Sequence, residues 1–222
     1  MQFSFCEFAG EEHLSLSVKE YSHLFKVRRI VSNSTLDFAN LKDDKIYTYI
    51  INDINKKEAN LTLTKTKNSQ KIMSSKVHIG WCVVEPKIIE KHIAMLSEMG
   101  VDKLTLVYAD FSQKSYKIDK KRLQRILINS CQQSGRTTLM EIEVLNSLED
   151  YLSLYPKSVI IDFCENYLDG NQNISNFLVG PEGGFSVDER KHFTCRDVFG
   201  LKSPNILRSE TVVVGVCAKL VL

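Results

Sequence analysis

The chain has 222 residues and a formal net charge of +2, with 29 Lys and Arg against 27 Asp and Glu. Its 43% hydrophobic and 25% charged content is typical of a globular protein and excludes a disordered chain, which cannot bury enough apolar surface to offset its ordering entropy. It has no apolar run of about 18 residues that could span a membrane, and its acid-containing start does not resemble a signal peptide. We therefore expect a cytoplasmic protein without membrane contact.

The six cysteines and five histidines show no spacing typical of a metal site. There is no CxxC pair for zinc and no HExxH pair on a helix. We therefore expect no bound metal, and cysteines that behave as small apolar residues in a reducing compartment.

The first 66 residues predict a small β module. Short segments rich in β-branched and aromatic residues alternate with turn residues, at 1–8, 35–39, 45–53 and 58–66. The intervening segment 21–30 could form a short helix. Several short strands of this kind are typical of a small barrel. Residues 67–76 are polar and basic, lack an apolar period and are expected to be a linker.

The pattern from residue 77 to residue 222 is different. Apolar strands are predicted at 77–84, 103–108, 158–163, 176–179 and 196–199, and amphipathic helices at 87–99 and 119–131. Because strands and helices alternate, we expect an α/β domain with a mostly parallel sheet.

The carboxyl-terminal segment TVVVGVCAKLVL, residues 211–222, is apolar except for Lys219. Ser209 could cap a helix here, with Glu210 in the first turn, where the helix dipole favours an acid. An all-round apolar helix must be covered on every face. We therefore expect a buried helix that takes part in a subunit interface.

Two loops could carry chemistry, and the first is the glycine-rich turn at residues 178–186, LVGPEGGFS. A strand ends there, and Ser186 with Glu189 predicts a capping box that starts a helix. Such a turn can cradle a nucleotide-like ligand. It has no Lys for a polyphosphate, and Glu182 would repel phosphates but suit hydroxyls, an amine or a cation. The alternative is a tight structural connection.

The second loop, at residues 201–211, again leads from a strand into a helix. Arg208, Ser209, Glu210 and Thr211 place dense polar groups before the apolar helix. They could simply cap that helix and form an Arg–Glu pair. However, ligands of open α/β sheets bind where strands end, and two such loops in one chain favour a binding site.

Basic residues are concentrated in two places. Residues 113–125 carry six Lys and Arg against one acid, with Arg136 further on, and Arg28 and Arg29 lie near His23 in the β module. Such clusters could hold the phosphates of a nucleic acid, although a solvated helix face is the common alternative.

The sequence NFLVGPEGGFSVDE at 176–189, followed by LKSPNILRSET at 201–211, resembles the paired signature of the RsmE-type 16S ribosomal RNA uridine N3-methyltransferases of the SPOUT (trefoil-knot) superfamily. HLFKVRR at 23–29 and NSCQQSGR at 129–136 resemble further segments of that family. The likeness covers essentially the whole chain. Ser203 and Asn205 depart from it, because the family has Gly and Arg there.

The resemblance implies an α/β fold with a small amino-terminal PUA-like β-barrel, at residues 1–66, that helps hold RNA. Residues 77–222 would form a SPOUT knot domain that binds S-adenosyl-L-methionine and forms a homodimer. The implied activity is methylation of N3 of a specific uridine in 16S rRNA, in the decoding region of the small ribosomal subunit. The alternatives are another SPOUT RNA methyltransferase, acting on tRNA or a ribose 2′-hydroxyl, and a non-enzymatic RNA-binding module.

The resemblance also suggests site residues. Arg208 would orient uracil or stabilise its imide anion, and Glu210 would orient Arg208. The candidate cofactor-binding residues are Leu178, Val179, Gly180, Pro181, Glu182, Gly183, Leu201, Ser203, Asn205, Ile206, Leu207, Ser209 and Thr211. The candidate RNA-binding residues are His23, Arg28, Arg29, Lys114 and Arg136.

Overall fold

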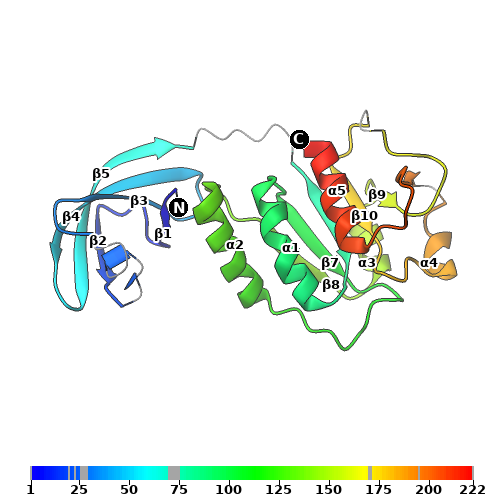
Figure 1. Ribbon diagram of the computed structural model, residues 1–222, viewed down its shortest axis with the longest axis horizontal. Coiled ribbons are helices and arrows are strands. Elements are labelled where there is room, and N and C mark those ends of the chain that lie inside the picture. Colours follow the sequence, from blue (N-terminus) through cyan, green and yellow to red (C-terminus); the bar gives the residue numbers. More distant parts are fainter. Residues whose placement is uncertain are drawn as a thin grey trace. The chain divides into compact units, whose positions relative to one another are not determined.

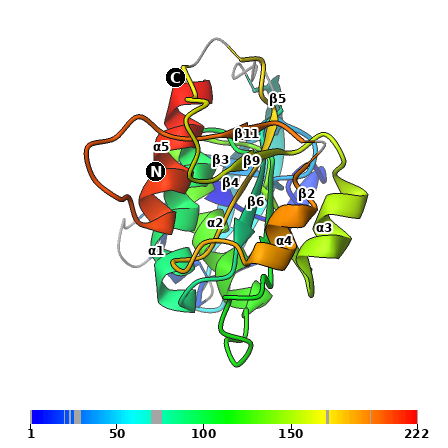
Figure 2. The same ribbon diagram turned by 90° about the vertical axis from the view of Figure 1, so that its right-hand side faces the viewer.

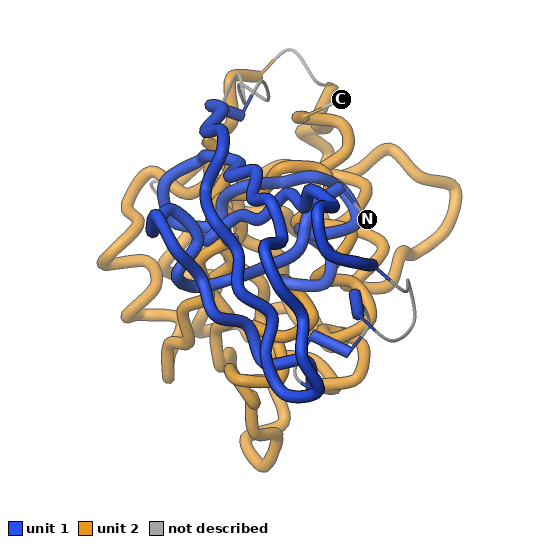
Figure 3. Tube along the Cα trace, turned by 90° about the vertical axis from the view of Figure 1, so that its left-hand side faces the viewer, with its two compact units in different colours: residues 1–72, 128–139 blue, residues 73–127, 140–222 orange. Residues whose placement is uncertain are grey.

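The computed structural model describes residues 2–19, 21–22, 24–25, 30–69, 76–169, 172–194 and 196–221. The chain divides into two compact units (Figure 3). Unit 1 comprises residues 1–72 and 128–139, and unit 2 comprises residues 73–127 and 140–222. The sequence pattern alone places residues 128–139 in the second domain, whereas their contacts group them with unit 1.

Unit 1 is built on a five-stranded sheet in the order β1-β3-β4-β5-β2 (Figure 1). Its strands are β1 (Ser4–Phe5), β2 (His13–Ser17), β3 (Thr35–Ala39), β4 (Lys45–Ile54) and β5 (Glu58–Asn68). The long β4–β5 hairpin is antiparallel and contains two register shifts, which bend a sheet and increase its twist. The side chains of Phe38, Tyr49 and Ile51 fill the core on one side of this sheet.

The end of helix α2 (Lys120–Ser134) and the turn after it belong to unit 1 through side-chain contacts. Cys131 is buried with Phe3 and Leu41. The amide oxygen of Gln132 accepts a 3.0 Å hydrogen bond from the backbone N–H of Phe5. These contacts join residues far apart in sequence, so no local pattern could reveal them.

Unit 2 contains a six-stranded sheet in the order β11-β9-β10-β6-β7-β8, in which all neighbouring strands are parallel. Its strands are β6 (His78–Cys82), β7 (Lys103–Val107), β8 (Glu141–Leu145), β9 (Val159–Ile161), β10 (Asn176–Val179) and β11 (Val198–Phe199). Because every strand runs the same way, the loops that follow them all emerge at one edge.

The helices of unit 2 cover both faces of this sheet, with α1 and α5 on one side and α3 and α4 on the other (Figure 2). They are α1 (Pro86–Glu98), α3 (Leu148–Leu154), α4 (Val187–Lys191) and α5 (Ser209–Val221), besides the start of α2. In α1, Pro86 occupies the first turn and Ile89, Ile93 and Leu96 form the buried face. Among the described residues, no helix is long and apolar enough to cross a bilayer.

Helix α5 differs from the sequence expectation at its start. It begins at Ser209, so this residue is inside the helix rather than its cap, and its hydroxyl bonds elsewhere. Val213, Val216 and Cys217 are buried, but Thr211 and Gly215 are exposed. One copy of the chain therefore covers only one side of this apolar helix.

Candidate functional site

A cavity of about 500 Å³ lies at the carboxyl ends of β9, β10 and β11. This volume suits a small-molecule ligand, and ligands of open α/β sheets bind at this edge. The walls come from three loops, which begin after Ile161, Val179 and Phe199. The candidate residues that line the cavity are Val179, Gly180, Pro181, Glu182, Leu201, Ser203, Asn205, Ile206, Leu207, Arg208 and Ser209.

The glycine-rich turn that follows β10 is held by local hydrogen bonds. Gly184 has a φ of 69°, which favours glycine, and the expected capping box at Ser186 and Glu189 is confirmed. Glu189 also accepts a 2.8 Å hydrogen bond from the N–H of Asp110, which follows β7. The turn is therefore fixed both to its own helix and to a neighbouring loop.

The Ser209 hydroxyl joins the two loops that the sequence singled out. It donates a 2.5 Å hydrogen bond to the carbonyl of Gly180 and accepts a 2.9 Å bond from Nε1 of Trp81, in β6. Trp81 and Ser209 are both buried, so these bonds are shielded from water. Residues 81, 180 and 209 thus form one small polar centre beside the cavity.

The second loop, whose residues line the cavity, has backbone donors without partners among the described residues. The N–H groups of Leu201, Ile206 and Leu207 make no hydrogen bond to any residue that the structure describes. Ser203 and Asn205 are bonded to each other, with the Ser203 hydroxyl donating to the Asn205 carbonyl at 2.8 Å. This side-chain bond restrains the loop between these two residues.

Sequence reasoning missed the third wall, the loop that follows β9. The Asp162 side chain is 7% exposed there and accepts two hydrogen bonds from Arg190 of α4, at 2.7 and 3.1 Å. The exposed aromatic residues Phe163 and Tyr167 also border the cavity. The segment DFCENY matches no binding motif, and only the place of β9 between β10 and β11 brings it here.

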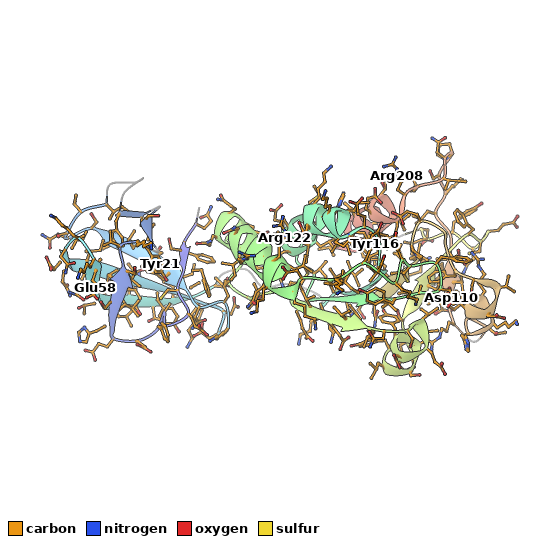
Figure 4. The ribbon with its side chains drawn as sticks, turned by 90° about the horizontal axis from the view of Figure 1, so that it is seen from below. Tyr21, Glu58, Asp110, Tyr116, Arg122 and Arg208 are labelled. Carbon is orange, nitrogen blue, oxygen red and sulfur yellow. The ribbon has the colours of Figure 1, made fainter. Side chains whose placement is uncertain are left out.

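Arg208 and Glu210 lie at the start of α5. The Arg208 side chain is 83% exposed and extends outward (Figure 4), whereas that of Glu210 is 11% exposed. Their nearest charged atoms are 4.0 Å apart. Oε2 of Glu210 is buried and has no hydrogen-bond partner among the described residues. A buried carboxylate in this position favours a cation, and the Arg208 guanidinium is the group that it holds nearby.

Three candidate cofactor residues do not line the cavity. Leu178 is fully buried in the core beneath it. Gly183 contacts the loop after β7, because a Cβ at this position would lie 3.1 Å from Cβ of Phe111. Thr211 is exposed on α5.

The candidate RNA-binding residues differ in where they lie and in how exposed they are. His23, Arg28 and Arg29 lie outside the described residues. Lys114 is exposed in the loop after β7. Arg136 is only 7% exposed, and its Nε donates to the Thr138 carbonyl at 2.7 Å, so it holds a turn of unit 1 and presents little surface to RNA.

The cavity fits a cationic ligand with an apolar ring and hydroxyl groups. The Glu182 and Glu165 carboxylates border it, whereas Asp162 is neutralised by Arg190. Val179 and Phe185 supply apolar surface, and the free N–H groups of the second loop can bond to ring nitrogens. S-adenosylmethionine combines these features in one molecule.

Two family models match the chain. The RNA methyltransferase PUA domain matches residues 16–64, and the RNA methyltransferase domain matches residues 70–221. The second match covers more than half of the chain and includes every residue that lines the cavity.

Curated relatives match over nearly their whole length. A Helicobacter pylori protein named ribosomal RNA small subunit methyltransferase E is 40% identical over 222 residues, covering 98% of both chains. A protein of the same name from Aquifex aeolicus is 29% identical, covering 93% of both chains.

Solved structures show the same fold. Ribosomal RNA small subunit methyltransferase E of Neisseria gonorrhoeae, bound to S-adenosyl methionine, gives a TM-score of 0.82 at 18% identity, covering 98% of this chain and 95% of that one. A Legionella pneumophila methyltransferase, in complex with bound cofactor SAM, gives 0.80 at 22% identity, covering 97% and 94%. The expected fold class, an α/β methyltransferase domain with a PUA-like β module, is confirmed. The chain belongs to the ribosomal RNA small subunit methyltransferase E family of RNA methyltransferases.

Proposed function

We propose that the protein transfers the methyl group of S-adenosyl-L-methionine to N3 of a specific uridine in 16S ribosomal RNA, in the decoding region of the small subunit. The observation that carries this proposal is that the two motif loops, which the Ser209 hydroxyl joins, form two walls of one cavity. The 40% identity to proteins named ribosomal RNA small subunit methyltransferase E supports the substrate class. The SAM bound in two structural neighbours supports the donor.

The cavity residues would hold and orient the donor. When bound, S-adenosylmethionine supplies an activated methyl group on a positively charged sulfur. Glu182 would attract that charge or the amino group, and the free N–H groups of Ile206 and Leu207 could bond to the adenine. Val179 and Phe185 give the ring an apolar wall and exclude water. These contacts place the methyl carbon for attack, which is a large part of the rate enhancement of a transfer reaction.

The acceptor nitrogen must lose its proton, and negative charge then spreads over the two uracil oxygens. The exposed Arg208 guanidinium at the mouth of the cavity can donate hydrogen bonds to these oxygens. Glu210 lies behind it, 4.0 Å from the guanidinium, and would direct it. The target base has to leave its stack to reach this position, as bases generally do when enzymes act on them.

Substitution of Arg208 tests its role. We expect Arg208→Ala to lower the methylation rate about 100-fold or more, because a donor to the developing charge is lost. S-adenosylmethionine affinity, measured by calorimetry, should stay within about twofold. Arg208→Lys is the matched variant, and it should recover part of the rate. Full turnover by the alanine variant would contradict the assignment.

The product defines the substrate. Small subunits from cells that lack the protein should accept labelled methyl groups, and mass analysis of nuclease fragments should place them on N3 of one uridine. A ribose 2′-O-methyl product, or labelling of tRNA alone, would instead indicate a different SPOUT activity. Binding of RNA without turnover would indicate a non-enzymatic module.

We also propose a cytoplasmic homodimer formed through α5 and α1. The exposed side of α5 contains Thr211 and Gly215, and Met95 of α1 is also exposed. A second copy would cover this surface, and light scattering should give twice the mass of one chain. A monomer at micromolar concentration would contradict this proposal. Unit 1, which contains the PUA match, would help to hold the RNA.

A further inference from the structure

The loop between β7 and α2, residues 108–119, places an exposed aromatic ring beside the glycine-rich turn. Phe111 is 57% exposed. Its Cβ lies so close to Gly183 that a Cβ added to the glycine would be 3.1 Å away. Pro181, Glu182 and Gly184 of the same turn line the cavity. The ring therefore lies beside a turn that forms one wall of the cavity.

Hydrogen bonds hold this loop in position. The N–H of Asp110 donates to Glu189 at 2.8 Å, and its carboxylate accepts a 2.6 Å bond from the Ser186 hydroxyl. Further along, the Tyr108 hydroxyl donates to the Tyr116 carbonyl at 2.5 Å. Asp110 and Tyr116, labelled in Figure 4, thus fix both parts of the loop. A pre-ordered aromatic ring loses little entropy when a partner stacks on it.

The chain that follows the ring is basic. Lys114 and Lys117 follow Phe111 in the loop, and Lys120, Lys121 and Arg125 follow in α2. None of these five has a carboxylate within ion-pair distance among the described residues, whereas Arg122 is paired with Glu90 at 2.6 Å. Both acids of this segment are engaged, since Asp110 accepts from Ser186 and Asp119 accepts from the N–H of Arg122.

We infer that residues 108–118 form a docking surface for single-stranded RNA next to the target uridine, where Phe111 stacks on a nucleobase and Lys114 and Lys117 hold phosphates. This inference rests on the proposed methyltransferase function and adds how its substrate is held. Stacking on aromatic rings combined with basic contacts is the usual way proteins bind unpaired nucleotides. The positive charge favours a polyanion over a second copy, which would bring the same lysines to the interface.

The test compares Phe111→Ala, Phe111→Tyr and Leu154→Ala. Leu154 is a similarly exposed apolar residue, on α3, and serves as the matched control. With small subunits as substrate, Phe111→Ala should raise the KM about tenfold or more, the effect of losing one stacked base. Phe111→Tyr and Leu154→Ala should remain within about twofold of the unchanged protein. The S-adenosylmethionine affinity should be unchanged in all three, which also shows that the cavity is folded.

A single-stranded RNA oligonucleotide, followed by fluorescence anisotropy at several salt concentrations, separates the two contributions. Phe111→Ala should weaken binding with an unchanged salt slope, whereas Lys114→Gln should reduce the slope by about 0.7, as expected for one lost phosphate contact. Unchanged KM and RNA affinity in Phe111→Ala would overturn the inference. So would a change of this variant from dimer to monomer in light scattering, which would assign the ring to a contact between copies.

The two proposals fail in different ways. If the unchanged protein methylates no RNA but its oligonucleotide affinity still depends on Phe111, the docking surface stands and the proposed activity is wrong. If it methylates small subunits and Phe111→Ala has no effect on KM or affinity, the activity stands and the docking surface is wrong.

Discussion

The two edges of the unit 2 sheet are built in opposite ways. At the edge where the strands begin, polar side chains are bonded to each other. His78 bonds to the hydroxyl of Thr105 at 2.8 Å, and this hydroxyl donates to Glu143 at 2.9 Å. Tyr155 donates to the same carboxylate at 2.7 Å. A second group of hydrogen bonds joins the Tyr151 hydroxyl to Ser158 and Asn176, near the starts of β9 and β10.

At the edge where the strands end, backbone groups form part of the polar surface of the cavity walls. The cavity walls are glycine-rich or extended segments, and several of their N–H groups are left without partners among the described residues. A small set of side chains holds the loops together: Ser209, the Asp162–Arg190 pair, and the bonds of Asp110 to Ser186 and Glu189. The comparison suggests that one edge stabilises the unit while the other is kept free for ligands. Substitutions at the two edges should therefore have separable effects.

The largest effect on the ligand edge is expected from Gly200→Ala. A Cβ at Gly200 would lie 2.1 Å from the backbone carbonyl oxygen of Cys164, and no side-chain movement can relieve this clash. The loop after β9 has to shift out of the cavity wall. We expect S-adenosylmethionine affinity, measured by calorimetry, to fall about 100-fold, which corresponds to nearly 3 kcal/mol. Unchanged affinity would show that this loop does not contact the donor.

The opposite result is expected from Tyr151→Phe. The Tyr151 hydroxyl is hydrogen-bonded to Ser158 and Asn176, both at 2.8 Å, at the starting edge of the sheet. Its loss should reduce the free energy of unfolding by about 1–2 kcal/mol, as for a buried hydrogen-bonding group. Urea denaturation measures this change. Donor affinity should stay the same, and a joint fall of both quantities would end the distinction between the edges.

The smallest effect is expected from the titration of His78. Burial, and next the positive charge of Lys103, lower the pKa of His78 to about 4, although Glu143 and Glu141 act in the opposite direction. In the unfolded chain the His78 imidazole takes up a proton near pH 6.5, whereas in the folded chain it does so only near pH 4. The stabilising contribution of neutral His78 is therefore lost as the pH falls from about 6.5 to about 4.

Urea unfolding of the unchanged protein and of His78→Gln, at pH 7 and pH 5, measures this contribution. Since the imidazole is partly exposed, we expect it to be about 1 kcal/mol, less than the full pKa shift implies. The loss of stability between the two pH values should therefore be smaller by this amount in His78→Gln. Equal losses in the two proteins would show that His78 titrates normally.

The parts of this molecule that sequence could predict are those with local causes. The strand at 176–179 and the capping box at Ser186 agree with the structure because strand patterns and helix starts are written in adjacent residues. Glycine and polar clusters likewise marked two cavity walls. The methyl donor was predicted from the resemblance to a known family and not from any local sequence pattern.

The features that sequence missed depend on contacts between distant segments. The loop after β9 borders the cavity only because β9 lies between β10 and β11. Strands β2 and β8 and helix α3 were not predicted, although the strand segments HLSLS and EIEVL alternate and α3 has an N-cap at Ser147, because these elements are only five to seven residues long. Phe111 resembled any other apolar residue until its place next to Gly183 was known.

The Ser209 hydroxyl has a consequence for biosynthesis. All the residues that line the cavity lie between Ile161 and Val212, and the bond from Ser209 to Gly180 holds their loops together. A nascent chain on the ribosome therefore has most of its β module and inner strands before it has any part of the pocket. Domains generally fold in the order in which they emerge, so competence to take up the donor should be the last property that a newly made molecule acquires.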